Sequence, residues 1–191
     1  MVGTTSGKCV EPGGMQLTET SLPGAYVIDL EPVEDARGFF ARAWSARELS
    51  SVGLESRIDE CNLSFNGRRG TLRGMHFQRP PHAEVKLIRC IKGALYDVIV
   101  DLRTDSPTFR HWVGFELDEE NRRMLYVPRG FAHGFQTLAD ETEVYYMISN
   151  AHVPEAASGV RWNDPSFGID WPMAEPTVIS DKDRSWPDFT G

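Results

Sequence analysis

The sequence predicts an all-β domain, on two observations. Short segments rich in β-branched and aromatic residues are separated by Gly and Pro, and little of the chain has helical periodicity. The expected strands are 25–30, 72–78, 85–91, 94–101, 112–117, 124–127, 135–138 and 143–149. Only 46–51 and 119–122 look helical, and both are brief. Short strands without intervening helices are typical of a sandwich or a jelly-roll barrel, whose interior is packed solid or holds a ligand.

The two central segments predict a hairpin. Segments 85–91 and 94–101 are joined by Lys92 and Gly93, which form a natural turn. Both segments carry apolar residues on both parities in places, so we expect one face in the core and the other partly enclosed.

The segment 72–78 predicts an irregular strand. Regular alternation would place Arg73 on one face and His76 on the other, so the two side chains would not point to the same place. Gly74, between them, marks a position where a bulge could redirect one of the two.

Length and composition indicate one domain with an acidic balance and no cluster of basic residues. The 191 residues include 20 Lys and Arg against 28 Asp and Glu, and 40% are hydrophobic. These values exclude a disordered tail, a collagen-like repeat and a disulfide-rich miniprotein. The net charge of −8, without a block of basic residues, argues against nucleic-acid or membrane partners. We expect a flexible leader over 1–16 and a single domain over 17–191.

The cysteines and the hydrophobic pattern favour a cytoplasmic protein. Cys9, Cys61 and Cys90 are an odd number without the spacing of a disulfide framework or a zinc site. The N-terminal segment lacks the apolar stretch of a signal peptide, and no apolar run reaches the ~18 residues that span a bilayer.

Ionisable residues inside the expected strands point to a functional site. Core-facing strand positions rarely carry charge, because an unpaired buried charge is costly. Such residues lie within or beside apolar segments here: Arg73, His76, Lys86, Arg89, Asp97, Asp101, His133 and Glu143. Some of them will face solvent on the alternate parity, so this pattern alone does not assign roles.

A series of collinear motifs identifies a family resemblance. They are 37–40 (RGFF), 72–78 (LRGMHFQ), 86–87 (KL), 100–103 (VDLR), 106–109 (SPTF), 126–128 (YVP), 130–135 (GFAHGF), 161–165 (RWNDP) and 180–183 (SDKD). In order and spacing the chain closely resembles the dTDP-4-dehydrorhamnose 3,5-epimerases. The resemblance implies a cupin-type jelly roll, a double-stranded β-helix, and a homodimer. It implies epimerisation at C3 and/or C5 of a dTDP-linked 4-keto-6-deoxyhexose in rhamnose-type biosynthesis, without metal or organic cofactor.

The resemblance also implies catalytic roles. His76 aligns with the family's base, Asp183 with the carboxylate that pairs with it, and Tyr146 with the proton-donating tyrosine. Lys86, between two apolar residues, would face an enolate oxygen or a nearby carboxylate. Epimerisation beside a ketone needs a base, an acid across the ring and a cation near the ketone oxygen, and these residues supply all three.

Substrate contacts are carried over in the same way. The resemblance places Arg37 and Arg73 at the diphosphate, with Arg37 reaching the partner subunit's site. The other implied contacts, toward the base, the sugar and the rest of the substrate, are Asn62, Glu60, His133 and Lys182.

Several positions depart from the family pattern in the binding shell. Arg42 stands where many members have Glu, Glu60 where Gln is usual, and His152 where a tyrosine is common. A family glutamate falls on Ala157, although Glu155 is close. These changes leave double or single epimerisation, the nucleotide and the sugar open.

Other functions remain as alternatives: a single-site 3- or 5-epimerase, a catalytically silent nucleotide-sugar-binding module, and a keto-isomerase of the same fold. A metal-dependent cupin is disfavoured, because His76 is not part of an HxH cluster, and His82 and His111 are interpreted as surface residues. Retention of the four predicted catalytic residues together argues against a silent module.

Overall fold

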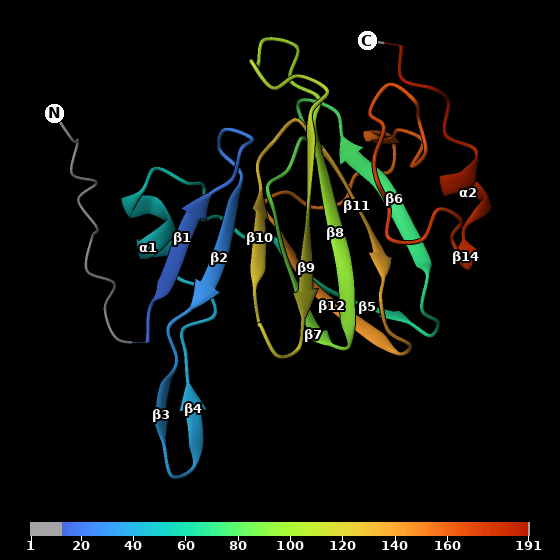
Figure 1. The fold of residues 1–191 in the computed structure, drawn as a ribbon. Helices are drawn as coiled ribbons and strands as arrows, with labels where there is room; N and C mark the ends of the chain where they lie inside the picture. The colour runs from blue at the N-terminus through green and yellow to red at the C-terminus, as the bar shows by residue number, and fades with distance from the viewer. Residues whose placement is uncertain (1–12, 191) are drawn as a thin grey trace, which may run out of the picture.

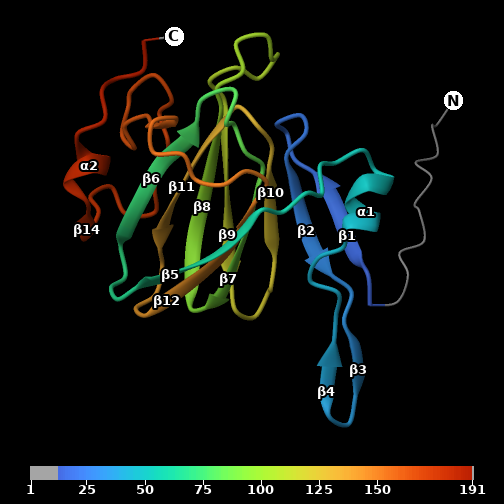
Figure 2. The same cartoon turned by 180° about the vertical axis from the view of Figure 1, so that it is seen from behind.

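The structure, a computed structural model, describes residues 13–190 as two facing β-sheets that form a jelly roll (Figures 1 and 2). The first sheet has the antiparallel order β1 (Met15–Glu19), β2 (Tyr26–Leu30), β10 (Met124–Val127), β7 (Lys86–Lys92), β12 (Thr142–Ile148), β5 (Glu60–Asn66). The second runs β13 (Ala157–Gly159), β6 (Thr71–Gln78), β11 (Phe131–Thr137), β8 (Ala94–Asp101), β9 (Trp112–Asp118), and β14 (Val178–Ile179) pairs in parallel with β6. The predicted all-β jelly roll is confirmed.

The remaining elements lie outside the two sheets. Strands β3 (Val33–Asp35) and β4 (Gly38–Phe40) form a hairpin that projects away from the jelly roll. Helix α1 (Ala46–Ser51), predicted from the sequence, lies beside β1, and the short helix α2 (Asp181–Arg184) lies near β6 at the opposite side (Figures 1 and 2).

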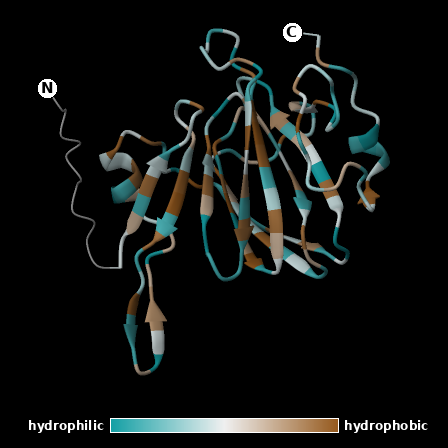
Figure 3. Cartoon of the chain, in the orientation of Figure 1, coloured by the Kyte–Doolittle hydropathy of each residue, from teal (hydrophilic) through white to brown (hydrophobic). Residues whose placement is uncertain are grey.

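Three apolar clusters hold these layers together. One lies between the sheets and includes Ile88, Ile99 and Phe135. The other two cover the outer faces, one beneath the C-terminal segment around Trp162 and one beneath α1 around Leu49. Both parities of several strands are therefore buried, and hydrophobic and hydrophilic segments alternate along the strands in Figure 3. This confirms the predicted partial enclosure of the second face.

The predicted hairpin at Lys92 and Gly93 is wrong. β7 pairs with β10 and β12 in the first sheet, whereas β8 pairs with β11 and β9 in the second. Gly93 has a φ of +75°, and a Cβ there would lie 2.8 Å from Thr142 Oγ1. A glycine is therefore needed where the chain bends from one sheet to the other.

Other boundaries also differ from the expectation. Residues 119–122 are not helical. Residues 119–121 form a turn, in which the Asp118 carboxylate accepts the backbone N–H groups of Glu120 and Asn121, and Arg122 follows with a φ of +51°. β11 begins at Phe131 rather than at residue 135. β1 begins at Met15, inside the predicted leader, of which residues 1–12 lie outside the described part.

A buried carboxylate organises the loop after β8. Asp101 accepts hydrogen bonds from Arg103, Ser106 and Thr108. Burial alone would raise the pKa of Asp101, but these hydrogen bonds outweigh it and lower the pKa to about 2. The ordinary value is 3.8, so the charged form stabilises the folded state.

We therefore expect Asp101→Asn to lower the free energy of unfolding by about 2 kcal/mol at neutral pH, a figure that follows from the lowered pKa. A lowered carboxylate pKa contributes stability that is complete above 3.8 and lost as the pH falls through about 2. The gap between the variant and the unsubstituted chain should thus close over this range in urea titrations. Asp105→Asn, at an exposed position in the same loop, is the control. A gap of constant size at all pH values would contradict the charge explanation.

Candidate active site

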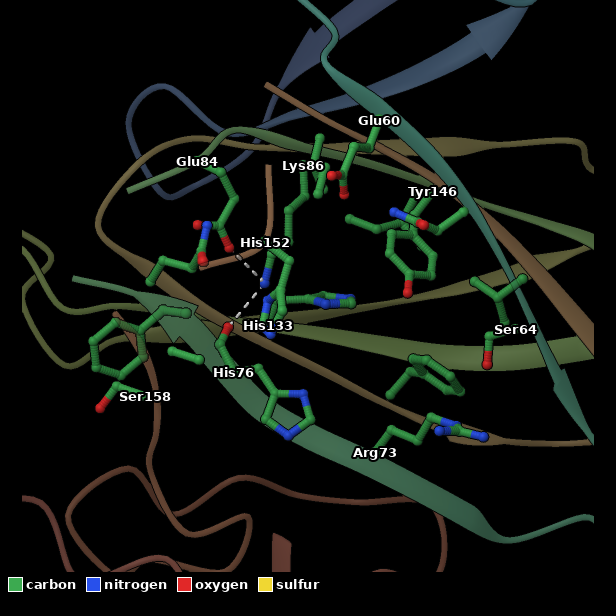
Figure 4. Close-up of a pocket in the computed structure, with 18 of the residues that line it drawn as sticks. Glu60, Ser64, Arg73, His76, Glu84, Lys86, His133, Tyr146, His152 and Ser158 are labelled. Carbon is green, nitrogen blue, oxygen red and sulfur yellow. Dashed lines mark hydrogen bonds and ion pairs between the residues drawn. The ribbon is translucent and has the colours of Figure 1, made fainter. Parts of the chain in front are cut away.

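A pocket of about 520 Å³ opens between the two sheets (Figure 4). Strands β5, β7 and β12 form one wall, and β6 and β11 form the other. The pocket collects every predicted site residue that the structure describes except Arg37 and Asp183: Glu60, Asn62, Arg73, His76, Lys86, His133, Tyr146 and Lys182. Asp183 lies directly behind His76.

A bulge in β6 brings Arg73 and His76 to the same pocket. His76 pairs with His133 and Arg73 pairs with Phe135, so three residue steps on β6 oppose two on β11. The extra residue reverses the parity of the strand, as predicted for Gly74. A Cβ on Gly74 would lie 2.6 Å from the Gly134 Cα, so the two strands approach closely only without side chains here.

His76 and Asp183 form a dyad on the β6 wall. His76 Nε2 lies 2.6 Å from Asp183 Oδ1, and Asp183 Oδ2 accepts the Gly74 N–H at 3.2 Å. Ser180 caps α2 and accepts the Asp183 N–H, which fixes the carboxylate behind the ring. Burial is the largest single influence and opposes ionisation of Asp183, but the hydrogen bond and charge of His76, with the hydrogen bonds from Gly74 and Ser180, together hold the pKa of this carboxyl below its ordinary value. Because Nε2 is engaged, Nδ1 is the ring nitrogen available to accept a proton.

A second such pair lies beside the first. His133 Nε2 lies 2.6 Å from Asp97 Oδ1, and Asp97 is fully buried. His133 and His76 are register partners on neighbouring strands. The sequence analysis noted Asp97 as an ionisable residue in an apolar strand but assigned it no role. The signal that could have found it was its position inside the buried run of β8.

Lys86 reaches the pocket from the first sheet, and its ammonium contacts two oxygen atoms (Figure 4). Its ammonium lies 3.2 Å from Glu84 Oε1 and donates to the backbone carbonyl of His76 at 3.1 Å. Of the two partners considered for Lys86, an enolate oxygen and a nearby carboxylate, the structure shows a carboxylate, that of Glu84, which was not among the predicted site residues.

Tyr146 and Tyr145 point in opposite directions. Tyr146 lines the pocket and faces the β6 wall, so its hydroxyl and the His76 ring lie on opposite sides of the cavity (Figure 4). Tyr145 packs on the outer face of the same sheet, in the cluster around Leu49. The structure therefore separates the two tyrosines as strand parity predicts.

The rest of the lining combines apolar side chains, among them Ile88 and Phe135, with further polar residues. Asn62 and Glu60 project from β5, Arg73 donates to the buried Asn66, and Lys182 lies over the Trp186 ring. Arg37 is instead 88% exposed, on the projecting β3–β4 hairpin, and is paired with Asp35.

The comparisons with known proteins identify the family. Residues 19–191 match the family of dTDP-4-dehydrorhamnose 3,5-epimerases. The curated enzyme of this name from Methanothermobacter thermautotrophicus is 45% identical over 170 residues, which are 88% of this chain and 91% of that one. The chain belongs to this family. The crystal structure of the 3,5-epimerase from Bacillus anthracis, with TDP and pyrophosphate bound, has a TM-score of 0.88 and 43% identity, covering 92% and 99% of the two chains.

A single-site epimerase has the same fold. A 3′-monoepimerase from Streptomyces bikiniensis, in complex with dTDP-quinovose, has a TM-score of 0.81 and 29% identity, covering 88% of this chain and 85% of that one. Double and single epimerases thus share one fold, and this chain resembles both.

Of the four positions that depart from the family pattern, three lie in the pocket and one lies outside it. Glu60, His152 and Ala157 line the pocket, so these changes alter the binding surface. Arg42 lies outside the lining and forms an ion pair with Glu48 of α1, so its role is in the fold.

Residues 13–190 contain neither a side-chain cluster typical of a metal site nor a helix that could cross a membrane. No cluster of three or more His, Cys, Asp or Glu side chains has the arrangement of a metal site. Neither helix in this part of the chain is long and apolar enough to cross a membrane.

Proposed function

We propose that this chain epimerises a dTDP-linked 4-keto-6-deoxyhexose at C3 and C5, in the biosynthesis of a rhamnose-type deoxysugar. The observation that carries the proposal is the placement of the His76–Asp183 dyad on one wall and Tyr146 on the other. A sugar ring between them would present one face to a base and the other to an acid, which is what inversion at carbon requires.

The reaction would proceed through an enolate. His76 accepts the proton from a carbon beside the C4 ketone, and the C–H electron pair forms a C=C bond while the carbonyl pair moves to oxygen. Lys86 is the cation placed to stabilise that oxygen. Tyr146 then donates its proton to the opposite face of the carbon, which restores the ketone with inverted configuration. The tyrosinate and the imidazolium recover their starting states by proton exchange with water.

The test of this proposal is NMR spectroscopy of the purified protein in deuterated water with dTDP-4-keto-6-deoxyglucose. Incorporation of deuterium at both C3 and C5 is expected. Incorporation at one carbon would support the single-site alternative. That alternative is retained because Glu60 and His152, which depart from the family pattern, both line the pocket. No incorporation, together with tight binding of the same ligand, would indicate a silent binding module.

The proposed active unit is a homodimer. The β3–β4 hairpin exposes Phe39 and Phe40, and the edge strand β5 exposes Leu63 and Phe65 on the face away from the pocket. Exposed apolar side chains of this size are typical of a protein contact. In the proposed dimer, Arg37 on the hairpin reaches the diphosphate in the partner's pocket, where an arginine fork suits phosphate oxygens.

We expect Arg37→Ala to raise KM by about 10- to 100-fold with a smaller effect on kcat, because a charge-assisted phosphate contact is lost and the proton-transfer groups remain. Mixing Arg37→Ala chains with His76→Ala chains tests whether Arg37 acts across the interface. A hybrid dimer would contain one complete site, so a re-equilibrated equal mixture should recover about a quarter of the unsubstituted activity at low substrate. Failure of the mixture to exceed the sum of its components, with hybrid dimers shown by mass spectrometry, would place Arg37 in its own chain's site or outside any site.

A further inference from the structure

The carboxylate of Glu84 lies inside the pocket wall, just before β7. Its side chain is only 5% exposed and its Oε1 contacts Lys86, yet Oε2 is buried without a hydrogen-bond partner in the described part of the chain. A buried carboxylate with one unsatisfied oxygen is costly to the folded state. A stabilising hydrogen-bond network therefore does not account for a glutamate at this buried position. The contact that can account for it is the ion pair with Lys86.

The ammonium of Lys86 has three N–H donors. The His76 carbonyl accepts one of them, and Glu84 Oε1 lies 3.2 Å from the same ammonium as its ion-pair partner. The ammonium therefore keeps a donor for a ligand in the pocket that Lys86 lines. The two oxygen atoms thus restrict the direction of the ammonium, and one of them belongs to the backbone of the predicted base.

The charge of Lys86 also points to Glu84 as the residue that controls the ammonium. Lys86 is only 15% exposed, and a cation at this depth needs a compensating negative charge. Glu84 is the carboxylate in ion-pair contact with it. Other charged groups line the pocket, but Glu60, Arg73 and Lys182 have no ion pair with Lys86 among the described residues.

We infer that Glu84 is a positioning residue that holds the Lys86 ammonium in the direction required to stabilise the enolate oxygen. The inference rests on the proposed epimerase activity and goes beyond it, because Glu84 acts through Lys86 and does not itself transfer a proton. The backbone placement of Glu84 fits this role, since the Val85 N–H is anchored on Ser149 Oγ at 2.9 Å and fixes the start of β7.

The direct test is a double-mutant cycle with Glu84→Ala and Lys86→Ala. Glu84→Ala should lower kcat by about 10²-fold with KM changed little, because misdirection of one catalytic group costs rate rather than binding. If Glu84 acts through Lys86, the same substitution in the Lys86→Ala background should have almost no further effect on kcat. An equal loss in both backgrounds, or an unchanged kcat in the single variant, would overturn the inference.

Conservative and control variants complete the experiment. Glu84→Gln keeps the volume and an oxygen that can accept from Lys86, so it should recover most of kcat, whereas Glu84→Leu keeps volume without an acceptor and should remain as slow as Glu84→Ala, which a loss of packing alone would not predict. Recovery no better than in Glu84→Ala would count against positioning by a hydrogen bond. Glu84→Leu replaces Glu84→Ala in the cycle if the alanine variant does not fold, and Glu120→Ala, at an exposed turn, is the control. An unsubstituted chain without deuterium exchange would contradict the proposed function, whereas active Glu84 variants beside an active parent would contradict only this inference.

Discussion

His76→Ala should abolish deuterium exchange at both substrate carbons, with a loss of about 10²- to 10⁴-fold, the range attributed to a positioned general base. The physical reason is the dyad: Asp183 holds Nε2 at 2.6 Å and leaves Nδ1 as the proton acceptor. Binding of TDP should change little, because affinity in the proposal depends on the nucleotide end of the pocket rather than on the base. The measurements are NMR exchange rates and a calorimetric titration with TDP.

The control for this prediction is His111→Ala, which removes an exposed histidine outside the pocket and should leave exchange unchanged. Near-normal exchange in His76→Ala would reject His76 as the base and direct attention to His133, the second histidine on the same wall. His133 also has a carboxylate behind it, so His133→Ala is the next variant to measure.

The positions of the pocket residues show how far sequence reasoning reaches. Alternation correctly separated Tyr146 from Tyr145, because a regular strand fixes which side chains share a face. Alternation alone would have put Arg73 and His76 on opposite faces, and a bulge brings them to the same one. Gly74 indicated the position of the bulge, because a glycine inside a strand often marks a close approach of backbones. Local sequence rules therefore predicted which of these side chains share a face, whereas the choice of site residues and their roles came from the family resemblance.

Strand pairings and side-chain contacts between distant parts of the chain could not be predicted from the sequence. The hairpin at Gly93 was wrong because a glycine turn permits the chain either to pair with itself or to cross to a second sheet, and only tertiary packing decides. Strand β5 was missed, although its alternation of polar Asn62 and Ser64 with apolar Leu63 and Phe65 was a usable signal. Contacts such as Asp97 with His133 join residues far apart in the chain, so no local pattern reveals them.

Tyr146→Phe should separate proton removal from inversion. His76 and Lys86 are intact in this variant, so the enolate can still form and return deuterium from the side of the base. The phenylalanine ring cannot donate a proton to the opposite face, so completed inversion should fall by about 10²- to 10⁴-fold, as expected for a general acid. We therefore expect deuterium in recovered substrate of unchanged configuration, measured by NMR spectroscopy with product quantified by chromatography.

Tyr145→Phe is the matched control for this prediction, because it removes the hydroxyl of the neighbouring residue on the outer face of the same strand. It should invert the substrate at the unsubstituted rate. Normal inversion by Tyr146→Phe would reject Tyr146 as the acid. Loss of both exchange and inversion would assign the hydroxyl to the enolisation step as well, and the two walls of the pocket would then act together from the first proton transfer.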